Sequence, residues 1–253
     1  MPVRTAVVTG PTSGIGLRFA HRLAARGFGL VLVARREQPL TALADELTGE
    51  YGVPVEVLAA DLTDRADLAR VEARVADASR PVDLLVNNAG FGLKRPFLDN
   101  DVEDEQAMLD VLVVAVLRLT HAALGPMLAR GSGAVINVSS VAGYLPRGSY
   151  SAAKAYVTAL SQWADLTYRD RGVRVMALLP GFTKTDFHGR MDVAHGSAPG
   201  WMWLDADRLV ADALADLDRG RTISVPSRRY KVLAALARAT PAALQARFQT
   251  LGR

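Results

Sequence analysis

A tyrosine and a lysine four positions apart, Tyr150 and Lys154, carry the side chains that proton transfer requires. On a helix, residues at this spacing lie on the same face. A tyrosine normally has a pKa near 10, and a neighbouring ammonium favours the phenolate and lowers that pKa. The pair therefore predicts a phenol that exchanges protons near neutral pH, as a carbonyl needs when it is reduced. Because the spacing also occurs by chance on solvated helix faces, other residues must support this prediction.

A glycine-rich segment, residues 9–16, lies between a short apolar run and a helical pattern. Glycines allow a tight turn there and let the main chain approach a pyrophosphate, while the helix N-terminus offers free N–H groups. The spacing, Gly-x-x-x-Gly-x-Gly, differs from the common dinucleotide fingerprint. A turn that only eases packing is the alternative, but the position after a first strand favours nucleotide binding.

Two arginines, Arg35 and Arg36, follow the second predicted strand. A site for NAD usually has an acidic residue here, which accepts hydrogen bonds from the adenosine ribose. Two guanidinium groups instead suit a 2′-phosphate, which they bind by charge-assisted, bidentate hydrogen bonds. An exposed basic loop is the alternative, and the location favours NADP.

Polar and small residues end three further predicted strands. Asp61 could accept a hydrogen bond from an adenine amine or could cap the next helix, although Thr63 or Asp64 could also act as that cap. Residues 87–90, Asn-Asn-Ala-Gly, leave room for a cofactor sugar and can also hold neighbouring strands together. Residues 137–140 end in two serines, and a hydroxyl there could donate to a substrate carbonyl oxygen beside Tyr150. Turn formation is the alternative for either serine.

These residues must be positioned by a regular alternation of strands and helices. Continuous apolar strands are typical of a parallel sheet that is buried on both faces, and the alternation predicts right-handed crossovers. The sequence thus predicts one Rossmann-like α/β domain over residues 1–253, doubly wound, with three layers in the order α/β/α. The predicted strands are 3–9, 30–34, 55–59, 82–86, 134–138, 173–179 and 222–225. The predicted helices are 14–26, 37–51, 65–78, 102–130, 150–169, 206–218 and 228–248, with Gly125 and Pro126 bending the end of the long fourth helix.

Two segments near the C-terminus lie outside this alternation. Residues 182–204 have no periodicity and contain several glycines, which predicts a substrate lid. Residues 228–250 form a basic, amphipathic helical extension, for which packing on the domain or on a partner subunit is favoured over a membrane surface.

Composition excludes several classes of function. The chain has 253 residues, of which 50% are hydrophobic, and a formal net charge of only +4. It has no cysteine, which excludes thiol catalysis and disulfides, and its four histidines lack metal-ligand spacing, so no metal site is expected. No basic stripe with interleaved aromatic residues indicates nucleic-acid binding. Neither a signal peptide nor an apolar run long enough to cross a bilayer is recognised, and we expect a cytoplasmic protein.

Together, these motifs resemble the short-chain dehydrogenase/reductase family in its single-domain form, over residues 3–187. The resemblance implies an NADP-dependent oxidoreductase that transfers a hydride between NADPH and a carbonyl or secondary alcohol, as a homodimer or homotetramer formed through the long helices. It implies that Tyr150 is the general acid in reduction and the base in oxidation, and that Lys154 holds the nicotinamide ribose. It also implies that Ser140, rather than Ser139, orients the substrate. From motifs and resemblance together, the candidate cofactor-binding residues are Gly10, Thr12, Ser13, Ile15, Gly16, Arg35, Arg36, Asp61, Leu62, Asn88, Ala89, Gly90, Tyr150, Lys154, Pro180, Gly181 and Thr183.

The chain departs from the family pattern at two places. Leu112 stands where many members have an asparagine that holds a proton-relaying water, so we expect slower or rerouted proton supply. This departure supports an alternative function, an NADP(H)-binding sensor or scaffold with weak or no turnover. The stretch from Ser140 to Tyr150 is also shorter than usual, which reshapes the mouth of the pocket.

Aromatic and apolar residues near the predicted lid suggest an apolar substrate. They would line the pocket wall, or they would serve lid packing or a subunit contact, and the sequence favours neither. These residues are Tyr144, Leu145, Phe187, Trp201 and Trp203.

Overall fold

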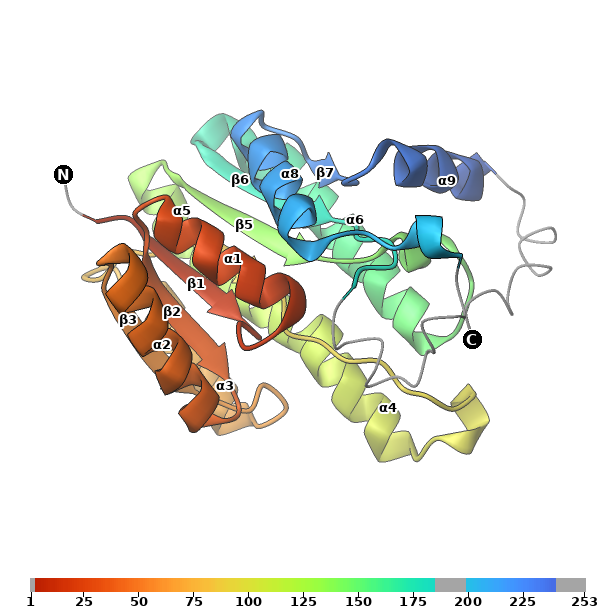
Figure 1. The fold of residues 1–253 in the computed structure, drawn as a ribbon, viewed down its shortest axis with the longest axis horizontal. Coiled ribbons are helices and arrows are strands. Elements are labelled where there is room, and N and C mark those ends of the chain that lie inside the picture. The colour runs from red at the N-terminus through yellow and green to blue at the C-terminus, as the bar shows by residue number, and fades with distance from the viewer. Residues whose placement is uncertain (1–2, 185–198, 240–253) are drawn as a thin grey trace.

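Seven parallel strands form a single sheet in the order β3-β2-β1-β4-β5-β6-β7 (Figure 1). The structure is a computed structural model, and it describes residues 3–184 and 199–239. Each strand end lies within two residues of its predicted position. The strands are β1 (Thr5–Thr9), β2 (Gly29–Ala34), β3 (Val55–Ala59), β4 (Leu84–Asn87), β5 (Gly133–Val138), β6 (Val173–Leu178) and β7 (Ile223–Ser224).

Helices cover both faces of the sheet, so the predicted three-layer, doubly wound, Rossmann-like fold is confirmed (Figure 1). The central strands are buried on both faces, as Ala6, Val7 and Val8 of β1 illustrate. This double burial explains why the strands read as continuous apolar runs. One face packs against α1 (Gly14–Ala25), α2 (Glu37–Tyr51) and α8 (Ala206–Asp218). The other packs against α3 (Arg65–Ala76), α5 (Val116–Arg130) and α6 (Ser149–Tyr168).

The sequence predicted one continuous helix over residues 102–130. The structure instead contains a π-helical turn within it. The helix consists of α4 (Val102–Leu109), the π-helical segment η2 (Asp110–Ala115) and α5, which continues through Pro126 to its end. An extra residue in a helical turn is locally unfavourable, and such turns often lie at functional sites. Leu112, the departure from the family pattern, lies in this turn.

The same helix corrects a second expectation from the sequence. Val102–Arg130 is long and apolar enough to cross a membrane by length and composition, whereas no such run was expected. Leu112, Leu119 and Met127 on this helix are almost completely buried against the rest of the protein, and Arg118 forms an ion pair with Glu72 of α3. These contacts pack part of the helix against the sheet and α3, and 39% of its most apolar stretch is buried inside the protein.

A buried carboxylate fixes the end of α6 against the sheet. Asp165 accepts hydrogen bonds from the Arg174 side chain, the Val175 amide and the Thr222 hydroxyl. Burial alone would raise the pKa of Asp165, but these bonds, with one from Arg169, outweigh burial and lower the pKa to about 2. The network therefore ties α6, which carries Tyr150 and Lys154, to β6 and to the residue before β7.

The predicted lid and C-terminal extension are described in part. At the base of the lid, Thr183 and Leu204 form a parallel bridge, and the short helix η5 (Gly200–Met202) precedes it. The rest of the lid, residues 185–198 with Phe187, lies outside the described residues. The extension begins with α9 (Arg228–Ala239), and the remainder of its predicted range also lies outside them.

Candidate active site

The predicted site residues lie at one edge of the sheet, in loops and in the first turns of helices α1 and α6. Because all the strands are parallel, the loops that leave β1 to β6 at their carboxyl ends meet at the same edge. The strand order reverses between β1 and β4, and ligands of open α/β sheets bind at such a point. The sheet thus brings together candidates that lie far apart in the sequence.

The loop between β1 and α1 needs its glycines for two physical reasons. Gly10 has a φ of +65°, a backbone conformation that other residues rarely adopt. Gly16 lies so close to Gly10 that a Cβ atom would be 2.1 Å from the Gly10 carbonyl oxygen. Thr12, Ser13 and Ile15 complete this loop and the start of α1, where Ser13 is the N-cap.

The N-terminus of α1 has the character of an anion site. No side-chain hydrogen bond from the described residues caps the helix, and its first turn has no acidic residue in this described segment. The first N–H groups of a helix and its dipole favour a negatively charged ligand.

Asn88 holds the glycine loop in place. Its side-chain amide donates to the carbonyl oxygens of Thr9 and Gly10, at 2.9 and 3.0 Å. The Thr9 hydroxyl in turn accepts hydrogen bonds from the main-chain amides of Asn88 and Ala89. These bonds account for the structural part of the role expected of residues 87–90.

The polar side chains in the loops after β2 and β3 differ in whether they bond to other described residues. Arg35 and Arg36 are exposed, and neither forms an ion pair or hydrogen bond with another described residue. Asp61, by contrast, accepts hydrogen bonds from the amide and hydroxyl of Thr63, at 2.9 and 2.8 Å. The cap of α3 is Asp64, one of the two alternatives that the sequence left open. Leu62 is buried in the core.

Ser140, Tyr150 and Lys154 come together where β5 ends and α6 begins. Tyr150 and Lys154 lie on one face of α6, as predicted, and the lysine Nζ is 5.7 Å from the centroid of the tyrosine ring. Lys154 is 5% exposed, and its ammonium donates to the Val138 carbonyl oxygen at 2.7 Å. The Tyr150 phenol forms a hydrogen bond with the Ser140 hydroxyl.

The pKa of Tyr150 shifts in the direction opposite to the predicted one. Burial raises the pKa of Tyr150 to about 12, and the hydrogen bond with Ser140 opposes this shift only in part. Burial also lowers the pKa of Lys154 to about 8. The spacing on the helix was predicted correctly, but the lysine ammonium is bonded to a carbonyl oxygen, so desolvation dominates the pKa of the phenol.

The two serines after β5 have different partners. The Ser139 hydroxyl is buried and bonds to the Lys154 carbonyl oxygen and the Thr158 hydroxyl, at 2.7 and 2.8 Å. Ser140 is only partly buried, and its oxygen accepts a hydrogen bond from the Ala142 amide at 3.1 Å. Ser139 therefore holds α6 in place, whereas Ser140 is the serine that contacts the tyrosine.

The loop after β6 faces the turn that carries Ser140. The Pro180 carbonyl oxygen accepts a hydrogen bond from the Val141 amide at 3.1 Å. Thr183 is buried, and its hydroxyl donates to the Gly181 carbonyl oxygen at 3.0 Å. Tyr230 of α9 packs against this loop, and no local signal in the sequence marks it, because the tail pattern indicates only a helix.

A buried glutamate was also missed. Glu105 of α4 accepts hydrogen bonds from the Asn100 amide and from the hydroxyl of Ser149, the residue before Tyr150. Its acidic neighbours in the sequence gave it the pattern of an ordinary solvated helix start, and only the fold shows its burial.

Leu112 packs directly beside the catalytic candidates. It forms a small apolar cluster with Met108 and Ala153, against which Tyr150 packs. A Cβ atom on Gly90 would be 2.8 Å from the Leu112 side chain, so the glycine leaves room for the leucine. An apolar surface therefore occupies the position where the family pattern has an amide.

The aromatic residues expected at the pocket have separate surroundings. Tyr144 and Leu145 line a pocket of about 520 Å³ together with Ser151 and Ala155 of α6. Trp203 packs on Phe182 at the base of the predicted lid, with ring centroids 5.7 Å apart, whereas Trp201 is exposed.

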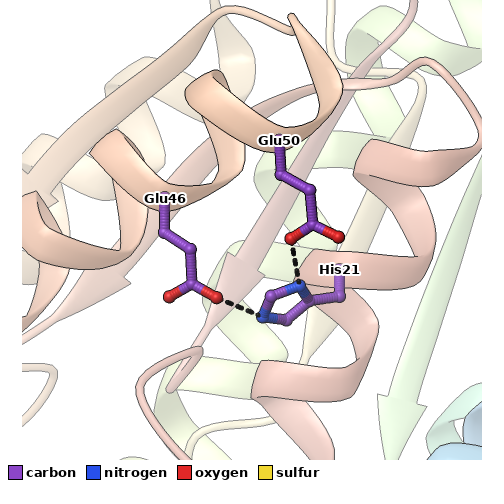
Figure 2. A group of neighbouring side chains, drawn as sticks. All are labelled: His21, Glu46 and Glu50. Carbon is purple, nitrogen blue, oxygen red and sulfur yellow. Dashed lines mark ion pairs between the residues drawn. The ribbon is translucent and has the colours of Figure 1, made fainter.

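One histidine–carboxylate group with possible metal ligands occurs among the described residues, away from this edge (Figure 2). It joins α1 to α2: His21 Nε2 is 3.6 Å from Glu46, and Nδ1 is 3.9 Å from Glu50. One ligand atom from each of the three side chains lies within 4.8 Å of the others, and the two carboxylates approach different nitrogens of the ring. The arrangement suits ion pairing between the two helices.

Comparison with known proteins agrees with this geometry. Residues 4–194 match the short chain dehydrogenase family. Sulfoacetaldehyde reductase 2 of Chromohalobacter salexigens is 36% identical over 216 residues, which cover 83% of this chain and 85% of that protein.

Two solved structures share the fold over nearly the whole chain. A short-chain dehydrogenase from Sphingobium yanoikuyae, in complex with NADPH, has a TM-score of 0.86 at 36% identity, with 94% of each chain covered. The bulky-bulky ketone specific alcohol dehydrogenase from Comamonas testosteroni has a TM-score of 0.81 at 32% identity, again with 94% of each chain covered. The chain therefore belongs to the short-chain dehydrogenase/reductase family, and it is an oxidoreductase of the class that acts on alcohol and carbonyl groups.

Proposed function

We propose that this protein is an NADPH-dependent reductase of carbonyl compounds, and a dehydrogenase of the corresponding secondary alcohols, with Tyr150 as general acid and base. The observation that carries the proposal is that Ser140, Tyr150 and Lys154 meet where β5 ends and α6 begins: the Lys154 Nζ is 5.7 Å from the centroid of the Tyr150 ring, and the Ser140 hydroxyl is close enough to lower the pKa of the phenol. A proton donor, a carbonyl-orienting group and a cation thus meet at the carboxyl edge of the sheet.

The chain's own residues fit NADP. The glycine loop and the N-terminus of α1 suit a pyrophosphate, and the free guanidinium groups of Arg35 and Arg36 suit a 2′-phosphate. The NADPH complex of the relative from Sphingobium yanoikuyae supports this choice. The adenosine would then lie towards β2 and β3, and the nicotinamide towards β5 and β6. When bound, NADPH supplies the hydride for the carbonyl carbon.

Three residues would then complete the reduction. Ser140 donates a hydrogen bond to the substrate oxygen and orients the carbonyl. Tyr150, whose raised pKa keeps it protonated at neutral pH, gives its proton to that oxygen as negative charge develops. Lys154 supplies a positive charge that stabilises the resulting phenolate. General acid catalysis of this kind contributes on the order of 10²–10⁴-fold to the rate.

Leu112 favours a second candidate, a protein that binds NADP(H) as a sensor or scaffold with little turnover. Its apolar side chain packs on Tyr150 and cannot hold a relay water there. We favour the enzyme, because Ser140, Tyr150 and Lys154 are all retained, and we infer that protons reach the site more slowly or by another route.

We propose an apolar or aromatic carbonyl compound as the substrate. Tyr144 and Leu145 line a pocket on α6 that adjoins the Ser140–Tyr150 segment in sequence but is not lined by Ser140, Tyr150 or Lys154. Phe182 and Trp203 form an apolar pair at the base of the predicted lid. The relative from Comamonas testosteroni, named for bulky-bulky ketones, supports a carbonyl substrate with large substituents. Thr183 and the main chain from Pro180 to Gly181 would face the nicotinamide.

We also propose that the protein is a cytoplasmic homodimer or homotetramer. Of the eleven residues in the run 109–119, five are buried and four are partly buried, and only Leu117 and Arg118 are exposed, so the run offers a partner a limited apolar surface. Trp163 and Leu166 of α6 are instead 54% and 68% exposed, and with Tyr156 they form an apolar face of that helix. Apolar side chains that gather on an exposed helix face are typical of an interface.

The experiment is to measure binding of NADPH and NADH to the purified protein, and then NADPH oxidation by the same sample with a panel of aldehydes, ketones and diketones. Preferential NADPH binding with turnover of any carbonyl would support the proposal. Tight NADPH binding without turnover across the panel would favour the sensor.

A further inference from the structure

Tyr230 of the C-terminal helix α9 lies against the loop that follows β6. It is 3% exposed, and its hydroxyl is fully used: it accepts a hydrogen bond from the Phe182 amide at 3.0 Å and donates to the Met202 carbonyl oxygen at 2.8 Å. One side chain therefore connects two segments at the base of the predicted lid. A buried phenol with both hydrogen bonds satisfied has a well-defined position.

The ring of Tyr230 packs on Gly181 without any intervening side chain. A Cβ atom on Gly181 would be 2.0 Å from Cζ of Tyr230 and 2.2 Å from Cε1. Position 181 therefore requires glycine because the Tyr230 ring leaves no room for a Cβ atom. The φ of Gly181 is not in the left-handed region, so the backbone conformation is not the reason. The sequence motif and the distant tyrosine form one packing unit.

This unit is connected to the catalytic residues. The Pro180 carbonyl oxygen, next to Gly181, accepts hydrogen bonds from the Val141 amide at 3.1 Å and from the Ser140 hydroxyl at 3.5 Å. Tyr230 also belongs to the apolar cluster against which Val141 and Tyr144 pack. A shift of Tyr230 would therefore move the main chain of Gly181 and Pro180, and with it the Pro180 carbonyl oxygen that Ser140 contacts.

Main-chain hydrogen bonds at the base of the lid also hold the loop after β6 in place. Leu204 donates from its amide to the Phe182 carbonyl oxygen at 2.7 Å, and its own carbonyl oxygen accepts from the Lys184 amide at 2.9 Å. Arg229, the neighbour of Tyr230, donates to the Trp201 carbonyl oxygen at 2.8 Å. Helix α9 thus contacts the segment before Leu204, and within the described part of α9 Tyr230 is the residue that bonds to both sides.

Ser227, just before α9, adds an independent observation. It has a φ of 109°, and among the described residues it is the only non-glycine residue with a positive φ. Such a conformation is unfavourable and persists where the surrounding structure imposes it, often near functional sites. Its carbonyl oxygen accepts the first hydrogen bond of α9, from the Lys231 amide at 3.0 Å. The turn at Ser227 therefore determines the direction of helix α9 and, with it, the position of Tyr230.

We propose that Tyr230 is a positioning residue, which fixes the Pro180–Gly181–Phe182 main chain for the nicotinamide end of NADPH and, through Pro180, the hydroxyl of Ser140. The inference rests on the proposed function of this site. It gives the C-terminal helix a role in ligand affinity, although α9 supplies no group to the reacting atoms.

The first test is Tyr230→Phe, which removes the hydroxyl and keeps the ring on Gly181. Loss of the two hydrogen bonds should weaken NADPH binding and raise KM for the carbonyl by roughly 3- to 10-fold each. The kcat value should stay within about twofold, because the lost interaction is made equally before and during the reaction. The matched control is Tyr51→Phe, which also removes a partly buried hydroxyl that bonds between two helices, but on α2. It should leave affinity, KM and kcat unchanged.

Gly181→Ala tests the packing independently. The added methyl group displaces the ring and should cause a similar loss of affinity. The double variant Tyr230→Phe/Gly181→Ala should then be less impaired than the product of the single effects, because both changes disrupt one unit.

The outcomes are distinct. If Tyr230→Phe lowers only the thermal unfolding midpoint and leaves NADPH affinity and KM as in the wild type, the residue is merely structural and the inference is wrong. It is also wrong if the two single effects multiply in the double variant. If the wild-type protein itself neither binds NADPH nor reduces a carbonyl, the proposed function fails first, and the inference falls with it.

Discussion

Tyr150 and Lys154 share one face of α6, yet the lysine Nζ lies 5.7 Å from the centroid of the tyrosine ring and bonds to a main-chain carbonyl oxygen. Each group therefore has a pKa governed by its own burial, about 12 for the phenol and about 8 for the ammonium. At neutral pH both groups are protonated, which is the state that a carbonyl reduction requires. In the proposed mechanism, Tyr150 is then able to donate its proton, and the Lys154 cation is present to stabilise the phenolate.

The pH dependence of reduction should follow Lys154. Its pKa is lowered from 10.5 to about 8, so the ammonium is charged below pH 8 and loses its charge as pH rises through that value. We expect kcat/KM for carbonyl reduction to be level below pH 8 and to fall above it, well before Tyr150 titrates. Steady-state measurements of kcat/KM from pH 6 to 10 test this prediction. Lys154→Arg keeps the charge throughout that range, and a fall near pH 8 in that variant would contradict the assignment.

Cofactor preference should depend on Arg35 and Arg36. Replacing both by serine removes charge-assisted hydrogen bonds to the 2′-phosphate, and NADPH affinity should fall by roughly 10- to 100-fold. Affinity for NADH should change little, because NADH has no 2′-phosphate. Titration of both nucleotides measures the change. The control is Arg171→Ser, an exposed arginine before the amino end of β6, at the opposite edge of the sheet. Equal losses for NADPH and NADH would rule out 2′-phosphate recognition.

Proton supply should respond to Leu112. The variant Leu112→Asn restores an amide beside Tyr150, so kcat should rise several-fold with NADPH affinity unchanged, and the solvent isotope effect on kcat should decrease. Leu112→Met is the matched control, because it keeps an apolar side chain of similar volume. If the asparagine variant is folded and its kcat does not exceed that of the methionine variant, the leucine does not limit proton supply.

The exposed face of α6 should determine assembly. Changing Trp163 and Leu166 to glutamate places two charges on the proposed interface, and light scattering should show a smaller species than the wild type. Val3 and Val232 are also exposed, and their replacement by glutamate gives a control for added charge elsewhere. A wild-type protein that is monomeric, or an unchanged assembly in the α6 variant, would exclude this interface.

Much of the framework could be predicted from sequence, because doubly buried strands and their helices carry strong periodic signals. The limits of α2, β3 and α8 agree with the prediction to the residue. The π-helical turn at Asp110–Ala115 could not be predicted, since the apolar pattern around Leu112 continues that of the flanking helix without a glycine or proline to mark a break. Its position follows from packing against Gly90 and Tyr150, which are distant in sequence.

The candidate site also has features that could be predicted from the sequence and features that could not. Glycine positions and the Tyr150–Lys154 spacing are local features, so the sequence contains them. The direction of the Tyr150 pKa shift depends on burial and on which acceptor Lys154 reaches, and spacing specifies neither. The contacts of Glu105 with Ser149 and of Tyr230 with Gly181 join segments far apart in the chain, so their side chains had no local signal.

The central claim, that Tyr150 transfers the proton in an NADPH-dependent reduction, is tested most directly by comparing the wild type with Tyr150→Phe. On one sample of each, NADPH affinity and NADPH oxidation with the best carbonyl of the panel are measured. We predict that the phenylalanine variant binds NADPH with wild-type affinity, while its kcat falls by roughly 10²-fold or more. Turnover by Tyr150→Phe at the wild-type rate would contradict the account.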